Sequence, residues 1–179
     1  MTPERRRGYR PTRRRLLAAF GATTTLSGCL SAPSSGGPQY ETHEIDGGAV
    51  FAPGLQDENE DAVFAALVTT SEESEAFVLD QFPAKADRTF VRATDFATQY
   101  LGVVQVAGLN SSMGLRVVDV AASRANLTVV VAVDDPTPQS DDRVVTTLLV
   151  RVTRDGDPVP DAIRVELSFD GRHETFSGE

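Results

Sequence analysis

The sequence predicts a mainly β fold, an antiparallel β-sandwich or open barrel with one short α-helix, after a cleaved signal and a disordered tether. Two observations point to this class. Short apolar or alternating runs recur along the chain, separated by turn signals rich in glycine, proline and aspartate. The runs at 129–131 and 144–145 consist of valine, whose branched side chain suits interior strands. We therefore expect a single β-rich domain at 49–179.

Seven runs predict strands. In chain order they are a short edge strand at 49–51 and longer strands at 62–69, 100–106, 115–120, 127–133, 144–152 and 163–169. The last of these alternates cleanly, which is typical of a half-buried strand. The run at 62–69 is short and almost wholly apolar, so a helix is the alternative there. Loops are expected at 108–114 and 134–142, and turn residues stand at 155–158 and 170–171.

The one predicted helix lies at 71–80. Thr70 or Ser71 can serve as its N-cap. Three glutamates follow in the first turn, where carboxylates interact favourably with the free N–H groups and the helix dipole: Glu72, Glu73 and Glu75. The helix is expected to end before Pro83, because the residue preceding a proline is disfavoured in the helical region.

The N-terminus resembles an export signal. Thr12 and then Arg13, Arg14, Leu16 and Leu17 stand at the positions of the twin-arginine motif S/T-R-R-x-[F/L]-L. The apolar run that follows, 16–26, has about half of the roughly 20 residues that a bilayer-spanning helix needs. We therefore predict a twin-arginine signal peptide at 1–28 rather than a permanent transmembrane helix.

A lipid attachment site follows the signal. Leu26, Ser27, Gly28 and Cys29 resemble a lipobox, L-[A/S/T]-[G/A]-C, in which small residues give a peptidase access and the thiol takes a diacyl- or dialkylglyceryl group. Cys29 is the only cysteine, so no intramolecular disulfide exists. Two lipid chains there would anchor the protein stably to the membrane. The alternative is an ordinary core cysteine after a basic arm.

The segment 29–48 is predicted to be the lipidated cysteine and a flexible tether. Its serines, glycines and prolines, concentrated at 31–38, cannot pack a core. His43 lies in a polar run of this segment. It is interpreted as a solvated histidine, and the alternative is a metal ligand.

The excess of acidic residues indicates a protein adapted to high salt concentration. Seven of the 17 basic residues and one of the 26 acidic residues lie in 1–28, which leaves 10 basic against 25 acidic residues. Lys85 is the only lysine. Such self-repulsion is screened at high salt, where the Debye length is about 3 Å at 1 M. The composition resembles extreme halophile surfaces, so we predict a haloarchaeal surface lipoprotein, with an acidic bacterial lipoprotein as the alternative. Nucleic-acid binding is disfavoured, because this surface repels phosphates.

Residues 62–155 loosely resemble the C-terminal domain of the PrcB-like family of protease-complex-stabilising lipoproteins. The resemblance lies in the order strand, short helix, Asp95-Phe96, strand, glycine-containing loop and further strands. The chain departs from the family at 112–115, where a Gly-Gly-Tyr-like step is usual, and at 146–149, which lacks the family's proline. The resemblance implies a similar fold and, more weakly, binding to a protease complex.

Candidate sites for chemistry are few. Ser111 is weighed as a nucleophile against a simple loop hydroxyl, since the flanking residues lack the G-x-S-x-G pattern. A blue-copper site needs a cysteine and two histidines, and this site is excluded because Cys29 is assigned to lipid.

Four acids could bind Ca²⁺ but lack EF-hand spacing, so they are interpreted as a solvated loop: Asp134, Asp135, Asp141 and Asp142. Asn110 and Asn126 begin glycosylation sequons, and Asn110 is preferred because a loop is expected there. No cofactor is predicted.

Together these features favour a non-enzymatic, lipid-anchored domain on the outer face of the cytoplasmic membrane that binds or stabilises a protein partner. The alternative is a small ligand- or Ca²⁺-binding module that uses the loops at 108–114 or 134–142. A hydrolase is the third hypothesis. A partner-binding domain should expose an apolar patch, a ligand module should have a concave pocket, and a hydrolase should place a base near Ser111.

Overall fold

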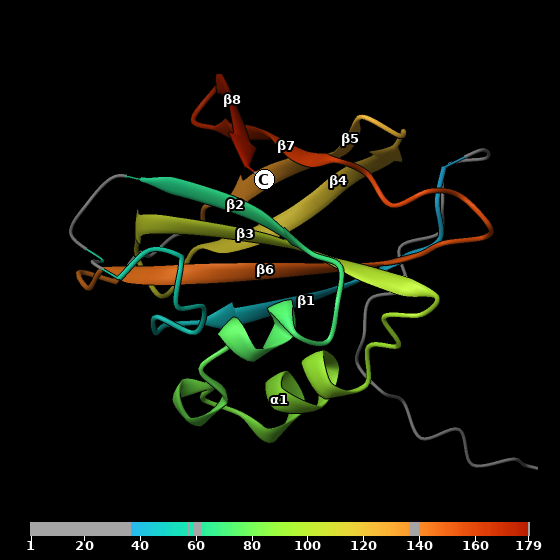
Figure 1. Cartoon of the computed structure of the whole chain (residues 1–179). Helices are drawn as coiled ribbons and strands as arrows, with labels where there is room; N and C mark the ends of the chain where they lie inside the picture. The colour runs from blue at the N-terminus through green and yellow to red at the C-terminus, as the bar shows by residue number, and fades with distance from the viewer. Residues whose placement is uncertain (1–36, 57, 59–61, 137–139, 179) are drawn as a thin grey trace, which may run out of the picture.

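The computed structural model describes residues 37–56, 58, 62–136 and 140–178. Two four-stranded sheets pack face to face, and a layer with one α-helix covers the outer face of the first sheet (Figure 1). The prediction of a mainly β fold with one short helix is confirmed, as a sandwich rather than an open barrel. The two sheets bury one apolar face each against the other, which is how antiparallel sheets form a core.

The first sheet is antiparallel throughout, in the order β1-β6-β3-β2. Its strands are β1 (Tyr40–Asp46), β2 (Val63–Val68), β3 (Gln99–Leu109) and β6 (Val144–Thr153). The central strands β3 and β6 carry the longest apolar runs, because they are covered by the second sheet on one face and by the helical layer on the other.

The second sheet has the order β4-β5-β7-β8. Its strands are β4 (Gly114–Ala122), β5 (Asn126–Asp134), β7 (Ala162–Phe169) and β8 (Arg172–Gly178). One pair in this sheet departs from the antiparallel pattern, because β5 and β7 pair in parallel. After β5 the chain crosses to the first sheet and forms β6 there. It then returns to the second sheet as β7, which lies beside β5 and runs in the same direction as β5. Strand β8 follows the predicted turn at 170–171 but was not itself expected.

The predicted tether at 29–48 is wrong for residues 40–46, which form strand β1. The strand pairs with β6 from Tyr40 opposite Val152 to Asp46 opposite Thr146. Ile45 is buried in the helix-side core, while most of the other residues are polar because β1 is a sheet edge. The polar composition of an edge strand resembles that of a tether, which explains the error.

The predicted helix at 71–80 is also wrong. The segment forms two 3₁₀ turns, Glu73–Ala76 and Leu79–Gln81, and the α-helix α1 follows at Lys85–Arg92. Glu73 does satisfy the backbone N–H groups of Thr69 and Thr70, as a cap should. The first 3₁₀ turn ends at Phe77, which forms an isolated β-bridge with Phe51. This bridge stands in place of the predicted strand at 49–51.

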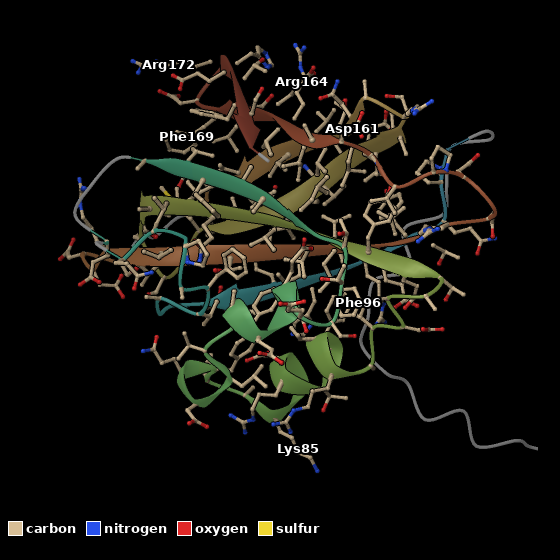
Figure 2. The ribbon with its side chains drawn as sticks, in the orientation of Figure 1. Lys85, Phe96, Asp161, Arg164, Phe169 and Arg172 are labelled. Carbon is tan, nitrogen blue, oxygen red and sulfur yellow. The ribbon has the colours of Figure 1, made fainter. Side chains whose placement is uncertain are left out.

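Pro83 lies between the second 3₁₀ turn and α1. Phe82 before it has an extended backbone, as a residue preceding proline prefers, and Ala84 after it is the N-cap of α1. The Asp87 side chain accepts a hydrogen bond from the backbone N–H of Ala84 at 2.8 Å and so caps α1. In Figure 2, Lys85 of this helix projects away from the sheets, on the side opposite Arg172 of β8.

Two apolar cores lie on either side of the first sheet. The sandwich core contains Leu127, Val150 and Ile163, and the helix-side core contains Leu149 and Phe77. The sheets approach closely at Gly102, where an added Cβ would lie 3.0 Å from a methyl group of Leu127. A side chain at this position would therefore push the two layers apart.

Glu44 links the two sheets at the β1–β4 edge. Its carboxylate accepts a hydrogen bond from the backbone N–H of Leu115 at 2.9 Å. Burial raises the pKa of Glu44, and the nearby carboxylates of Asp46 and Asp134 raise it further, against the lowering effect of the hydrogen bond. The ionised form is therefore less favourable in the folded domain than in the unfolded chain.

Replacing Glu44 with glutamine is expected to stabilise the domain at pH 7. The carboxyl keeps its proton to a higher pH when folded, so the wild type loses stability as the pH rises from the ordinary glutamate value through the folded value. Glutamine can still accept from Leu115 without ionising, so its advantage should vanish below about pH 4. Urea unfolding at both pH values tests this, with Glu75→Gln at an exposed site as the control. An equal gain at both pH values would contradict the explanation.

Candidate functional site

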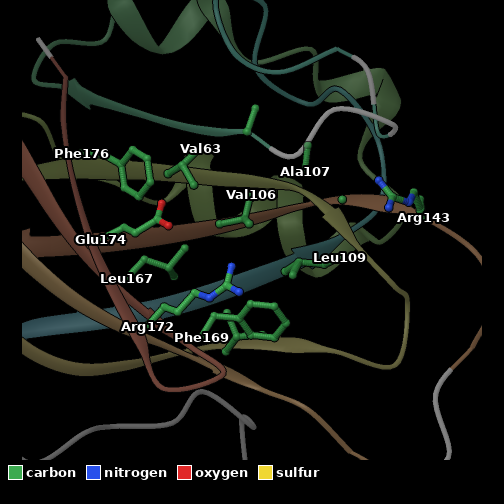
Figure 3. A pocket seen from close by; sticks show the side chains of 13 residues that line it. Val63, Val106, Ala107, Leu109, Arg143, Leu167, Phe169, Arg172, Glu174 and Phe176 are labelled. Carbon is green, nitrogen blue, oxygen red and sulfur yellow. The ribbon is translucent and has the colours of Figure 1, made fainter.

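A groove of about 480 Å³ opens between the two sheets, where the edge strands β2 and β8 diverge (Figure 3). Its walls are mostly apolar and come from both sheets, including Val63, Val106, Leu109, Leu167, Phe169 and Phe176. This volume lies within the range of about 300–1,000 Å³ that is usual for small-molecule sites. The groove is therefore the strongest candidate for a binding site among the described residues.

The β7–β8 hairpin builds one wall of the groove. Asp170 and Gly171 both have positive φ, 48° and 72°, as a two-residue hairpin turn of this kind requires. This turn places Phe169 directly opposite Arg172. Cross-strand partners share a face, so the inner face of the hairpin continues with Leu167 opposite Glu174.

The hairpin shows why the sandwich stays open at this end. In the middle of β7, Val165 of the sandwich core faces Phe176, which is partly buried and packs against that core. Toward the turn, the inner positions of β8 carry Glu174 and Arg172, whose charges would be costly to bury between two sheets.

At the opposite end of β8 the two sheets meet. An added Cβ on Gly178 would lie 1.8 Å from the carbonyl oxygen of Ala65 in β2. Glycine is therefore needed for this contact between the edge strands. The groove widens from this contact toward the turn at 170–171.

Three charged side chains line the groove: Arg143, Arg172 and Glu174. Arg172 points into the groove toward Val106 in Figure 3, and Arg143 lies at one end. Two of the 10 basic residues after Gly28, but only one of the 25 acidic residues, thus line this surface. The groove is less negative than the rest of the protein.

The two predicted loops meet beside the groove. The backbone N–H of Ser111 donates to Asp142 at 3.1 Å, and the hydroxyls of Ser111 and Ser140 lie 3.1 Å apart. The side-chain carbonyl of Asn110 accepts from the N–H and hydroxyl of Ser112 at 3.1 and 2.6 Å. The sequence predicted both loops but not this network between them.

The network does not supply a base for Ser111. Hydrogen bonds from Ser140 and Ser111 lower the pKa of Asp142 to about 2, so its carboxylate is a weak proton acceptor. Elsewhere in the described chain, Ser168 Oγ lies 2.7 Å from His173 Nδ1. These residues are cross-strand partners on the outer face of the hairpin, away from the groove.

The four aspartates considered for Ca²⁺ do not gather into one site. Within the residues that the structure describes, no group of three or more His, Cys, Asp or Glu side chains could hold a metal ion. Asp134 instead forms an exposed ion pair with Arg116 at 3.3 Å, and Asp142 accepts the hydrogen bond from Ser111. Asp135 is not free either, because its side chain or backbone interacts with another group. Asp141 is exposed.

The interpretation of His43 as a solvated tether residue is wrong. His43 lies in β1, with Nε2 2.9 Å from Asp87 Oδ1, and its ring stacks on Phe90 at 4.9 Å. The guanidinium of Arg151 lies over Phe90, 4.3 Å from the ring centre. These contacts dock α1 onto the first sheet. The sequence could not reveal them, because His43 and Asp87 are 44 residues apart.

The two sequons occupy different environments. Asn110 is buried, with 9% of its surface exposed, in the short connection between the end of β3 and the start of β4. Asn126 is the half-buried first residue of β5. Asn110 is therefore the less accessible of the two, although it lies in the connection between β3 and β4 as expected, and glycosylation of either residue stays a prediction.

The predicted export and lipidation residues lie outside the described residues: Arg13, Arg14, Leu16, Leu17, Leu26, Ser27, Gly28 and Cys29. Within the described part of the chain, no helix has the length and apolar character needed to span a membrane.

The comparison with protein-family models finds no match, and the searches of curated proteins and of solved structures find none either.

The groove was not predicted from the sequence. One signal was available, since in 172–176 the apolar Phe176 shares its strand face with Glu174 and Arg172. A strand that mixes apolar and charged residues on one face indicates a core that opens toward solvent.

Proposed function

We propose that this protein is a lipid-anchored, extracytoplasmic binding module whose inter-sheet groove takes an apolar ligand. The observation that carries the proposal is the groove of about 480 Å³ between β2 and β8, with walls that are mostly apolar. The export and lipidation motifs at 12–29 support an anchored location outside the cytoplasm.

The geometry supports presentation of the groove away from the membrane. The chain enters the described domain at residues 37–39 and reaches Tyr40, which lies opposite Val152 at one end of the first sheet. The groove lies at the other end, where β3 ends at Leu109 opposite Val144. The segment that leads to Cys29 thus joins the domain at the end opposite the groove.

The distribution of exposed apolar side chains favours a ligand over a broad protein interface. The large hydrophobic residues that are exposed in the described chain are Val118 at 53% and Phe169 at 37%. Phe169 belongs to the groove, and Val118 lies on the β4 edge. Binding to a protein partner stays a prediction, as does the resemblance to the PrcB-like family.

The groove can be tested with the uncharged fluorescent probe N-phenyl-1-naphthylamine. We would titrate it into the exported chain carrying Cys29→Ser, so that no lipid or detergent competes. Phe169→Asp is expected to weaken binding about tenfold or more, because contact with a phenyl side chain contributes roughly 1.5–3 kcal/mol.

The matched control is Val118→Asp, which places the same charge at the other exposed hydrophobic position. It should leave the affinity unchanged. The proposal fails if the wild type does not bind the probe, or if both variants bind it as the wild type does.

A further inference from the structure

We propose that the groove selects anionic amphiphiles, molecules with a hydrocarbon body and one carboxylate or sulfonate head, and that Arg172 binds the head. This inference rests on the proposed function, since it names the ligand class of the same groove. Its basis is the position and the pairing of Arg172.

Arg172 lies on the wall of the groove rather than on the outer surface. It faces Phe169 across the hairpin turn, and both side chains line the groove. Figure 3 shows the guanidinium pointing inward, toward the side of the groove formed by Val106. A guanidinium is weakly hydrated and tolerates apolar and aromatic neighbours, so arginine suits this position better than lysine would.

Arg172 makes no ion pair with any described residue. On the outer face of the same hairpin, Arg164 pairs with Glu166 at 3.4 Å, and Arg116 pairs with Asp134 at 3.3 Å. Arg92 and Arg124 also make no ion pair with a described residue, so what distinguishes Arg172 is its place on the apolar wall of the groove. Its guanidinium is available to a carboxylate from a ligand.

Glu174 defines where the head would lie. The inner face of β8 runs from Arg172 near the turn, through Glu174, to Phe176 beside the core. An anionic head placed deep in the groove would meet the Glu174 carboxylate, whereas one near the turn meets Arg172. The hydrocarbon body then extends along Leu167 and Phe176.

The amphiphile would bind as a dissolved monomer rather than as part of the bilayer. The groove lies at the end of the sheets opposite the entry of the N-terminal segment. It also holds about 480 Å³, a volume that suits one small molecule. These two observations favour a single molecule taken from the surroundings.

The test is displacement of N-phenyl-1-naphthylamine from the Cys29→Ser chain by three ligands of equal length: decanoate, decanol and decylamine, each below its aggregation limit. Decanoate is expected to bind about tenfold more tightly than decanol, because an arginine–carboxylate pair beside apolar walls forms strong, charge-assisted hydrogen bonds. Arg172→Gln should remove this difference while leaving the affinity for decanol unchanged. Glu174→Gln should strengthen decanoate binding.

Arg164→Gln is the control, since it removes the same charge from the outer face of the same hairpin. It should keep the preference for decanoate. Equal binding of decanoate and decanol by the wild type, or a preference for decylamine, would overturn the inference and leave the groove intact as an apolar site. Loss of the preference in Arg164→Gln would overturn it as well.

Two further outcomes complete the test. If neither the probe nor any ligand binds, both the inference and the proposed function fall. Sedimentation of the same chain with phosphatidylglycerol vesicles, dependent on Arg172, would overturn the claim that the ligand is a dissolved monomer. An absence of such binding, together with the decanoate preference, supports it.

Discussion

Replacing Cys29 with serine is expected to move nearly all of the protein from the membrane fraction to the soluble fraction. A hydroxyl cannot form the thioether to the glyceryl group, and no helix in the described residues has the features of a membrane span. Two lipid chains give stable anchoring, where one chain gives marginal binding. Cell fractionation followed by immunodetection measures the change directly.

Ser27→Ala is the matched control, because alanine is also accepted at that position of the lipobox. This variant should stay with the membrane. The lipoprotein assignment would be wrong if Cys29→Ser remained in the membrane fraction after high-salt washing, or if the wild type were itself soluble.

Replacing Gln105 with alanine is expected to destabilise the domain by about 2–4 kcal/mol. Gln105 is fully buried in β3, where Nε2 donates to Thr147 Oγ1 at 3.0 Å and Oε1 accepts from the backbone N–H of Leu55 at 2.8 Å. The variant would leave both partners unsatisfied and a cavity beside them. Urea unfolding in the salt that favours the folded state provides the measurement.

Gln56→Ala is the control for this prediction. The Gln56 side chain is exposed and donates to nearby carbonyl groups at 3.1 to 3.4 Å. Its loss should change the free energy of unfolding by no more than about 0.5 kcal/mol. A similar small change for Gln105→Ala would show that the buried network contributes little.

The six strands from β2 to β7 could be predicted because each has a local signal, whereas β8 was not expected. β5 and β6 are rich in valine, β7 alternates, and the turn at 170–171 has the aspartate–glycine sequence of a tight hairpin. β1 could not be predicted, because its polar residues make sense only once β6 is known to lie beside it. The same holds for the bridge from Phe51 to Phe77, which stops the predicted helix.

The groove could not be predicted from local patterns, because its walls come from both sheets. Val63 and Phe176 are more than a hundred residues apart in the chain and line the same space. Their proximity depends on β2 and β8 being neighbouring edges, and on the contact between Gly178 and Ala65 that closes one end. Sequence reasoning instead selected the loops at 108–114 and 134–142, which lie beside the groove.

The most direct test of the central claim is to locate a bound apolar molecule by methyl NMR of the Cys29→Ser chain. Addition of N-phenyl-1-naphthylamine is expected to shift the methyl signals of Val63, Val106, Leu109 and Leu167, which line the groove. The signals of Leu79 and Val91, which line a separate hollow under the first sheet, should stay unchanged. Shifts confined to that second hollow, or no shifts at all, would contradict the account.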